Sequence, residues 1–289
     1  MRAETLELRP IAGALGAEIG GVDLARLSAA QFTEIRRAFL EHIVIFFRDQ
    51  VLTPQQHKEF TAWFGPLSRV PYIKALDEHP EIIAVLKEPD ERKISVFGGA
   101  WHSDFSFLEE PPLGSVLYAL ETPSHGGDTL WSNMYAAYET LSDGMKRLLD
   151  PLVALHSGHV YGVDGIPADL RTSRSIAISR NNPEADVEHG HPVVRVHPET
   201  GRKALFVNSI YTTRFAGMSA EESRPLLDFL YAHATRPEFT CRFRWRKGSI
   251  AVWDNRCAMH YAINDYDGQR RLIHRTTIAG DRPVGPSAQ

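Results

Sequence analysis

The sequence predicts a mainly β fold with flanking helices, and three observations carry that prediction. Residues 43–47, 249–252 and 271–278 are short apolar or β-branched runs, with the length and composition of buried strands. The helical patterns are short and lie between the strand patterns. Candidate metal ligands occur at His102 and Asp104 and again at His260, and ligands so distant in the chain meet only where a sheet folds back on itself.

The N-terminal part predicts a strand pair and two helices. Residues 6–24 have the pattern of two short strands with glycine turns. A capping-box pattern at Ser28 begins the first helix, and Thr53-Pro54 begins the second, with proline at its first position. Residues 68–100, rich in proline, glycine and charge, are expected to be irregular.

The remainder predicts a strand-rich region that begins near Trp101. The elements expected there are strands at 114–120 and 128–131, two short helices within 133–150, a hairpin over 193–208, a helix at 220–235 and an alternating strand at 239–245. Residues 159–190 are polar and without a clear period. A loop of that length inside a domain is typical of a functional lid, and a passive surface insertion is the alternative.

The triplet His102-Ser103-Asp104 is the most informative motif. On a strand, residues i and i+2 project to the same face, so an imidazole and a carboxylate would lie side by side. With His260 they would complete a two-histidine, one-carboxylate triad, which leaves three positions on one face of Fe(II) open for a cosubstrate and O2. The triplet alone is weak evidence, because a surface histidine beside an aspartate gives the same pattern.

Two arginines follow His260 on the strand pattern at 271–278. Arg271 and Arg275 share one face of that strand, about 13 Å apart at roughly 3.3 Å per residue. Buried arginines need anionic partners, and guanidinium pairs bidentately with carboxylate or sulfonate-like groups. Two anion sites are therefore expected, one for a cosubstrate and one nearer the metal for a substrate. Two arginines on a solvent face are the alternative.

Two further segments support the triad. Gly126-Gly127 forms a turn that enters the strand at 128–131, where the Thr129 hydroxyl could hydrogen-bond an anion; a plain β-turn is the alternative. Trp253-Asp254-Asn255-Arg256 follows the apolar run 249–252 and leads to His260.

Together these motifs resemble the taurine dioxygenase family of Fe(II)/2-oxoglutarate-dependent oxygenases. The matching segments are Trp101-His102-Ser103-Asp104, Gly126-Gly127-Asp128-Thr129, Trp253-Asp254-Asn255-Arg256 with His260, Arg271 with Arg275, residues 16–24, and Phe64-Gly65-Pro66-Leu67. The resemblance covers nearly the whole chain. It implies one domain over residues 1–289, built as a double-stranded β-helix, or jelly roll, with a lid at 159–190.

The resemblance also implies cofactors and their ligands. His102, Asp104 and His260 would bind Fe(II). Thr129 and Arg271 would hold the distal carboxylate of 2-oxoglutarate. Trp253 would line the pocket. With O2, the enzyme would hydroxylate a C–H bond of its substrate and release succinate and CO2.

The substrate is expected to be a small anion, either an alkylsulfonate of the taurine kind, an alkyl sulfate ester or an aryloxyalkanoate. By resemblance, Arg275 binds its anionic group, and Tyr211 and Tyr72 are candidates for the same site, although packing is nearly as plausible for Tyr211. Taurine enzymes carry a histidine and an asparagine before the metal motif. Residues 70–74 and 97–100 lack that asparagine and show no evident histidine, which disfavours taurine itself and favours a more apolar pocket.

Other histidines are expected to be structural. His189-Gly190-His191 has the same-face spacing of a metal pair, but it lies in the polar segment without a following carboxylate. His156 and His159 have helical spacing and are interpreted as the end of a short helix.

The composition predicts a cytoplasmic enzyme. Charges of both signs are mixed along the chain and give a net charge of −4. The sequence has no long basic stripe of the kind that would indicate binding to nucleic acid. No apolar run suggests a membrane span, and the first residues lack the pattern of a signal peptide. Only Cys241 and Cys257 are present, which fits a reducing compartment. The resemblance also implies that the protein forms a homo-oligomer, either a dimer or a tetramer.

Two other functional classes compete with an oxygenase. The same barrel could hold Zn(II) or Mn(II) in a non-oxidative isomerase or hydrolase, because a fold does not fix a function. Arg271 argues against this, since a hydrolase has no need of a second anion site. A binding protein that has lost catalysis is disfavoured by the intact triad, because a buried polar cluster without a use has no packing advantage.

Overall fold

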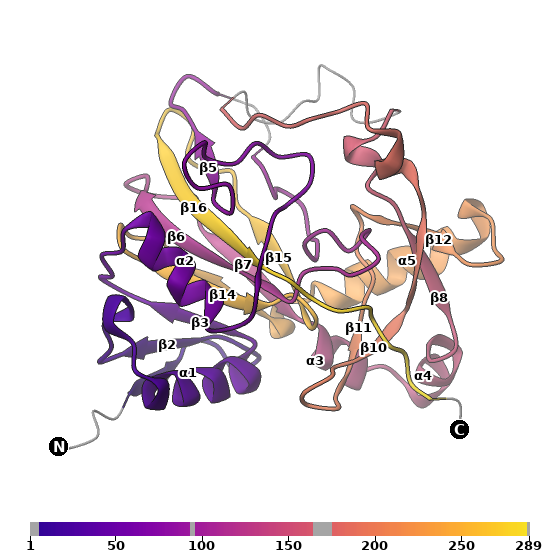
Figure 1. Ribbon diagram of the computed structural model, residues 1–289. Coiled ribbons are helices and arrows are strands. Elements are labelled where there is room, and N and C mark those ends of the chain that lie inside the picture. Colours follow the sequence, from indigo (N-terminus) through magenta and orange to yellow (C-terminus); the bar gives the residue numbers. More distant parts are fainter. Residues whose placement is uncertain (1–5, 93–95, 164–174, 288–289) are drawn as a thin grey trace.

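A computed structural model describes residues 6–92, 96–163 and 175–287 (Figure 1). The α-helices are α1 (Ala29–His42), α2 (Pro54–Ala62), α3 (Met134–Glu139), α4 (Asp143–Leu149) and α5 (Ala220–Ala234). The strands are β1 (Glu7–Pro10), β2 (Ala17–Gly20), β3 (Val44–Phe47), β4 (Leu67–Ser68), β5 (Ile83–Lys87), β6 (Gly114–Glu121), β7 (Thr129–Asn133), β8 (Val153–His156), β9 (His189–Pro192), β10 (Val194–Val196), β11 (Lys203–Leu205), β12 (Thr212–Phe215), β13 (Thr240–Phe243), β14 (Ile250–Asp254), β15 (Ala258–Ala262) and β16 (Arg271–Ile278). None of the helices in the described residues has the length and hydrophobicity of a transmembrane helix.

A large mixed sheet runs through the molecule. Its strand order is β1-β2-β3-β14-β6-β16-β4, and β5 pairs with β16 in addition. Strand β14 and most of β6 are buried on both faces, which explains why they read as continuous apolar runs, whereas burial alternates along the first half of β16. Strands distant in sequence are neighbours here, as β3 and β14 show.

Each face of this sheet packs against a different layer. On one face, Ile45 and Phe47 join Phe39 of α1 and Phe60 of α2 in a single core, and Figure 1 shows both helices beside β3. On the other face, Phe46 packs on Phe243 and Trp131 of a second, three-stranded sheet in the order β13-β7-β15. The alternation along β3 follows from the period of two in a strand. The functional side chains lie between these two sheets.

The predicted helix starts are confirmed. Ser28 and Thr53 each form a capping box, with Gln31 and Gln56 as the reciprocal partners. The helix expected at 220–235 is α5, and the two short helices expected in 133–150 are α3 and α4.

Three sequence-based expectations are wrong in detail. His102 and Asp104 were expected on a strand, but His102 forms an isolated β-bridge with His260 and Asp104 lies in the turn that follows. The stretch 68–100 contains strand β5, which forms because β16 offers it a free edge. His156 ends no helix and lies on β8, and His189 and His191 lie on β9, where His189 is the antiparallel partner of His156. Of the expected lid, residues 164–174 lie outside the described residues.

Candidate metal and cosubstrate site

The predicted triad comes together around one point. The backbones of His102 and His260 pair directly, with N–H to carbonyl distances of 3.1 and 2.8 Å. From this bridge both side chains reach Asp104, whose Oδ1 lies 3.5 Å from His102 Nε2 and 3.7 Å from His260 Nε2. All three residues are buried, and their potential ligand atoms lie within 4.8 Å of one another.

The donor set fits Fe(II). His102 Nδ1 donates a hydrogen bond to the carbonyl oxygen of Ala100 at 2.7 Å, which leaves the Nε2 lone pair directed at the shared point. Burial, together with the nearby His102, lowers the pKa of His260 well below its ordinary value, so the imidazole of His260 is neutral. Burial alone would raise the pKa of Asp104, but Arg275 and the two histidines hold it well below its usual range. Two imidazoles and one carboxylate are the ligands of non-haem Fe(II) sites.

The second oxygen of Asp104 is held by the protein. Ser115 Oγ donates to Oδ2 at 3.1 Å, and Arg275 Nη2 lies 2.7 Å from the same oxygen. Oδ1 is therefore the oxygen that remains for a metal. Sequence reasoning missed Ser115, because nothing in the pattern of β6 marks one small polar residue as facing this carboxylate.

A small cavity beside the triad contains the predicted cosubstrate residues. Thr129, Trp253, Arg271 and Arg275 line it together with His102 and His260, and it encloses about 30 Å³. Arg271 is buried, its Nε finds no acceptor in the described part of the chain, and burial lowers its pKa. The alternating burial along β16 confirms that Arg271 and Arg275 share the inner face of the strand rather than a solvent face.

The glycine turn before Thr129 has a packing role. Gly127 takes a φ of 69°, and a Cβ there would lie 3.3 Å from Arg271 Cδ and 3.2 Å from the ring of Tyr266. A side chain at this position would press on the arginine. The turn predicted at Gly126-Gly127 is thus more than a connection, because it allows Arg271 to lie against the backbone.

A larger cavity of about 230 Å³ also borders the triad. Its wall is mostly apolar and includes Val96, Phe97, Val160, Ile178, Ile210 and Tyr211. His102 and Asp104 form one end of it, and Arg180 is its one further charged lining residue among those that the structure describes.

The candidate substrate residues are divided among three places. Tyr211 is buried and lines the larger cavity. Tyr72 is not among the described lining residues; it stacks on Tyr161, which is, with ring centroids 5.4 Å apart. Arg275 lines the smaller cavity and contacts Asp104 and the ring of Phe105, which both line the larger one. Tyr161 and Arg180, which line the larger cavity, lie in the polar segment from 159 to 190, where no periodicity marked them.

Comparisons with known proteins agree with this geometry. Residues 7–277 match the family described as taurine catabolism dioxygenase TauD, TfdA family. The chain is 37% identical to an alpha-ketoglutarate-dependent sulfate ester dioxygenase from Pseudomonas putida, over 98% of this chain and 93% of that protein. A crystal structure of a taurine dioxygenase from Burkholderia xenovorans has a TM-score of 0.82 and 36% identity, covering 98% of this chain and 92% of the other. The structure of AAD-2 with Mn(II) and N-oxalylglycine has a TM-score of 0.77 and 29% identity, and the match covers 96% of this chain and 99% of the other.

The chain therefore belongs to the TauD/TfdA family. It is a 2-oxoglutarate-dependent dioxygenase, an oxidoreductase that uses Fe(II), 2-oxoglutarate (alpha-ketoglutarate) and O2, as the sequence predicted. The non-oxidative alternative has no support from these relatives, and the mainly β fold with few helices is confirmed.

Proposed function

We propose that this dioxygenase hydroxylates the carbon next to the ester oxygen of an alkyl sulfate. The observation that carries the proposal is the apolar wall of the larger cavity beside the triad. Burying an alkyl chain there contributes about 0.8 kcal/mol per methylene. The relative from Pseudomonas putida, named a sulfate ester dioxygenase, supports the same class.

The same cavity disfavours taurine. An ammonium group loses its hydration on burial and needs acceptors in return. Asp104 is the one carboxylate among the described lining residues, and it belongs to the proposed metal site. Arg180 adds a positive charge that would repel an ammonium group. Aryloxyalkanoates remain a second candidate, because the ring of an aryl ether would also suit the wall formed by Phe97, Ile210 and Tyr211.

We propose that His102, Asp104 and His260 hold the iron, and that Thr129 and Arg271 hold the distal carboxylate of 2-oxoglutarate in the smaller cavity beside Trp253. When bound, Fe(II) activates O2 with electrons supplied by 2-oxoglutarate. Arg275 supplies positive charge next to the metal for the sulfate group, and its 2.7 Å contact with Asp104 supports that location. The apolar wall orients the chain so that one carbon faces the open side of the triad and water is excluded.

The overall reaction balances without a further reactant. The alkyl sulfate, 2-oxoglutarate and O2 give the 1-hydroxyalkyl sulfate, succinate and CO2. That product is a hemiacetal ester. Its O–H proton leaves as the C–O bond to sulfate breaks, and the products are an aldehyde and hydrogen sulfate.

The organisation of the chain is also proposed. We propose that the two facing sheets form a jelly roll in a single domain over residues 1–289, with 159–190 as a lid; the lining positions of Tyr161, Ile178 and Arg180 support the lid. A homo-oligomer, dimer or tetramer, follows from the family resemblance. Cytoplasmic localisation is supported by the two free, buried cysteines.

The test is succinate formation from 2-oxoglutarate by iron-loaded enzyme under air. The panel contains alkyl sulfates of increasing chain length, alkylsulfonates of matched length, taurine and aryloxyalkanoates, with His102→Ala as the blank. We expect alkyl sulfates to stimulate succinate release together with an equimolar amount of sulfate. Stimulation by taurine alone would contradict the proposal, and stimulation by aryloxyalkanoates alone would favour the second candidate.

A further inference from the structure

Asn255 holds the peptide of the proposed metal carboxylate from both sides. Its Oδ1 accepts the backbone N–H of Asp104 at 2.6 Å, and its Nδ2 donates to the carbonyl oxygens of Asp104 at 2.9 Å and Pro112 at 3.1 Å. The side chain is only 1% exposed. These three hydrogen bonds use both N–H donors and the carbonyl oxygen of the Asn255 side chain, so they fix its orientation and its position.

Asp104 needs support of this kind because no regular element fixes it. It lies in a turn between the bridge at His102 and strand β6. The next residue, Phe105, takes a φ of 47°. A bulky residue in the left-handed region persists only where surrounding contacts determine the backbone. The contacts from Asn255 act on the peptide groups directly before and after the Asp104 side chain.

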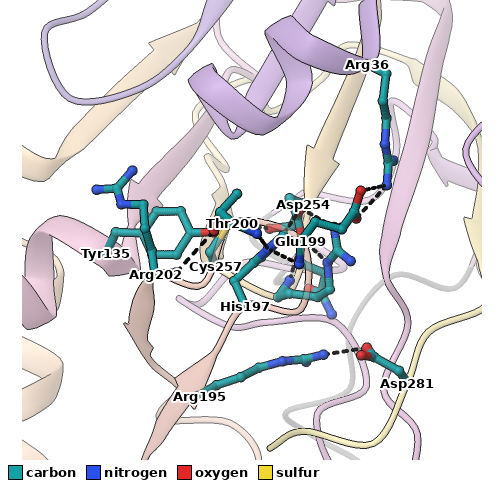
Figure 2. Close-up of polar contacts among 12 residues, drawn as sticks. Arg36, Tyr135, Arg195, His197, Glu199, Thr200, Arg202, Asp254, Cys257 and Asp281 are labelled. Carbon is teal, nitrogen blue, oxygen red and sulfur yellow. Dashed lines mark hydrogen bonds and ion pairs between the residues drawn. The ribbon is translucent and has the colours of Figure 1, made fainter. Parts of the chain in front are cut away.

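Asn255 is itself held by the residues on either side of it. Arg256 Nε and Nη2 donate to the two carboxylate oxygens of Asp254 at 2.8 and 2.7 Å, and His197 Nε2 lies 2.9 Å from Oδ2. Arg256 also pairs with Glu199 at 2.8 Å, and Glu199 bonds to Arg36 of α1. Figure 2 shows Arg36, Glu199, His197 and Asp254 converging on this turn. The turn therefore has a buried ionic anchor.

This anchor is not a second metal site, although His197, Asp254 and Cys257 lie close enough to be ligands. His197 Nδ1 accepts the backbone N–H groups of Glu199 and Thr200 at 3.2 and 3.1 Å, so its Nε2–H donates to Asp254. The guanidinium of Arg256 occupies both oxygens of that carboxylate. A cation would have to displace these bonds and would meet a positive charge.

We propose that Asn255 is a positioning residue that sets the Asp104 carboxylate relative to His102 and His260. The inference rests on the proposed metal triad. Without Asn255 the N–H of Asp104 is buried without a partner, the turn can relax, and Oδ1 moves away from the point that the two imidazoles share. Supporting residues of this kind change metal affinity by about 10- to 100-fold when they are removed.

The test is an anaerobic Co(II) titration of the full chain, followed by visible absorption and calorimetry. Asn255→Ala is expected to bind Co(II) about 10- to 100-fold more weakly than the wild type. Asn133→Ala is the matched control. Asn133 is also buried, donates to Ala14 at 2.7 Å and accepts from Ala136 at 3.0 Å, but it contacts none of the proposed ligands. Asn133→Ala should lower thermal stability and leave the affinity for Co(II) within twofold of the wild-type value.

A second variant keeps the inference testable if Asn255→Ala does not fold. Asn255→Asp retains an acceptor for the Asp104 N–H but places a carboxylate against two carbonyl oxygens, so an affinity loss of about 10-fold is expected. If a folded Asn255 variant bound Co(II) as tightly as the wild type while His102→Ala bound none, the role proposed for Asn255 would be refuted and the metal triad would stand. Equal binding by His102→Ala and the wild type would overturn the metal triad and this inference with it.

Discussion

The indole Nε1–H of Trp245 donates to Thr129 Oγ1 over 2.9 Å. Because the hydroxyl oxygen of Thr129 is used as an acceptor there, its own hydrogen is free to be donated into the cavity that contains Arg271. One neutral donor and one guanidinium thus face the place proposed for the distal carboxylate of 2-oxoglutarate.

Thr129→Val should raise the KM for 2-oxoglutarate by about 10- to 100-fold, the usual loss when a hydrogen bond to a charged group is removed. The two side chains have nearly the same shape, so Co(II) affinity should change little. Thermal stability should fall, because the buried indole N–H of Trp245 loses its acceptor and an unpaired buried donor costs about 1–3 kcal/mol. Succinate assays at varied 2-oxoglutarate measure the KM. An unchanged KM in a folded variant would show that the hydroxyl does not contact the cosubstrate.

Arg271→Ala should weaken 2-oxoglutarate binding by at least about 100-fold and spare the metal, because truncation removes the buried charge opposite the carboxylate. The neighbouring Arg270 is the control, since its side chain is 35% exposed and pairs with Glu88 and Glu121 at the surface. Calorimetry measures the two affinities separately, with N-oxalylglycine as the probe of the cosubstrate site and Co(II) as the probe of the metal site. Cosubstrate affinity equal to that of Arg270→Ala would refute the assignment.

Ile210→Phe should shorten the longest alkyl sulfate that the enzyme accepts. Ile210 lines the larger cavity, and each methylene excluded from it costs about 0.8 kcal/mol, or roughly fourfold in kcat/KM. The short members of the series should react at wild-type rates. Ile11→Phe, at a position 38% exposed, is the matched substitution outside the site. A uniform loss along the whole series would argue against the chain lying in this cavity.

Acid should destabilise the fold through buried histidines. Burial, with the nearby His274, lowers the pKa of His57 from 6.5 to about 3, and burial lowers that of His191 to about 4. The unfolded chain therefore binds more protons than the folded chain below pH 6.5. The stabilisation is complete above that pH and falls by about 1.4 kcal/mol per pH unit for each such histidine as the pH drops toward the folded pKa.

His57→Gln provides the measurement. Its free energy of unfolding, from urea titrations at pH 7.5 and pH 5, should fall less than that of the wild type between the two pH values. A glutamine amide can still bond to Thr276, which His57 Nε2 contacts at 3.2 Å, so the variant should fold. An identical pH dependence in both proteins would exclude His57 as a source of the acid sensitivity.

The strong periodic signals of the sequence predicted most of the elements. The alternation on β16 placed Arg271 and Arg275 on one buried face, and the two capping boxes placed the starts of α1 and α2. Such signals are local, because they depend only on spacing within one element.

What the sequence could not predict depends on partners distant in the chain. Strand β5 forms in a stretch of turn-like composition because β16 pairs with it. The interpretation of His156 as a helix end failed because β8 gains its backbone bonds from β9 and β12. Ser115 and Asn255 meet Asp104 only in the folded chain, so no local pattern predicted these contacts, although Asn255 belongs to the motif at 253–256.

Phe97, Gly98 and His102 line both cavities. The two cavities therefore share one wall, and a ligand that displaces this wall on one side changes the space on the other. Linkage requires such an effect to be reciprocal. If the chain of the primary substrate tightens 2-oxoglutarate binding by some factor, 2-oxoglutarate must tighten binding of that substrate by the same factor.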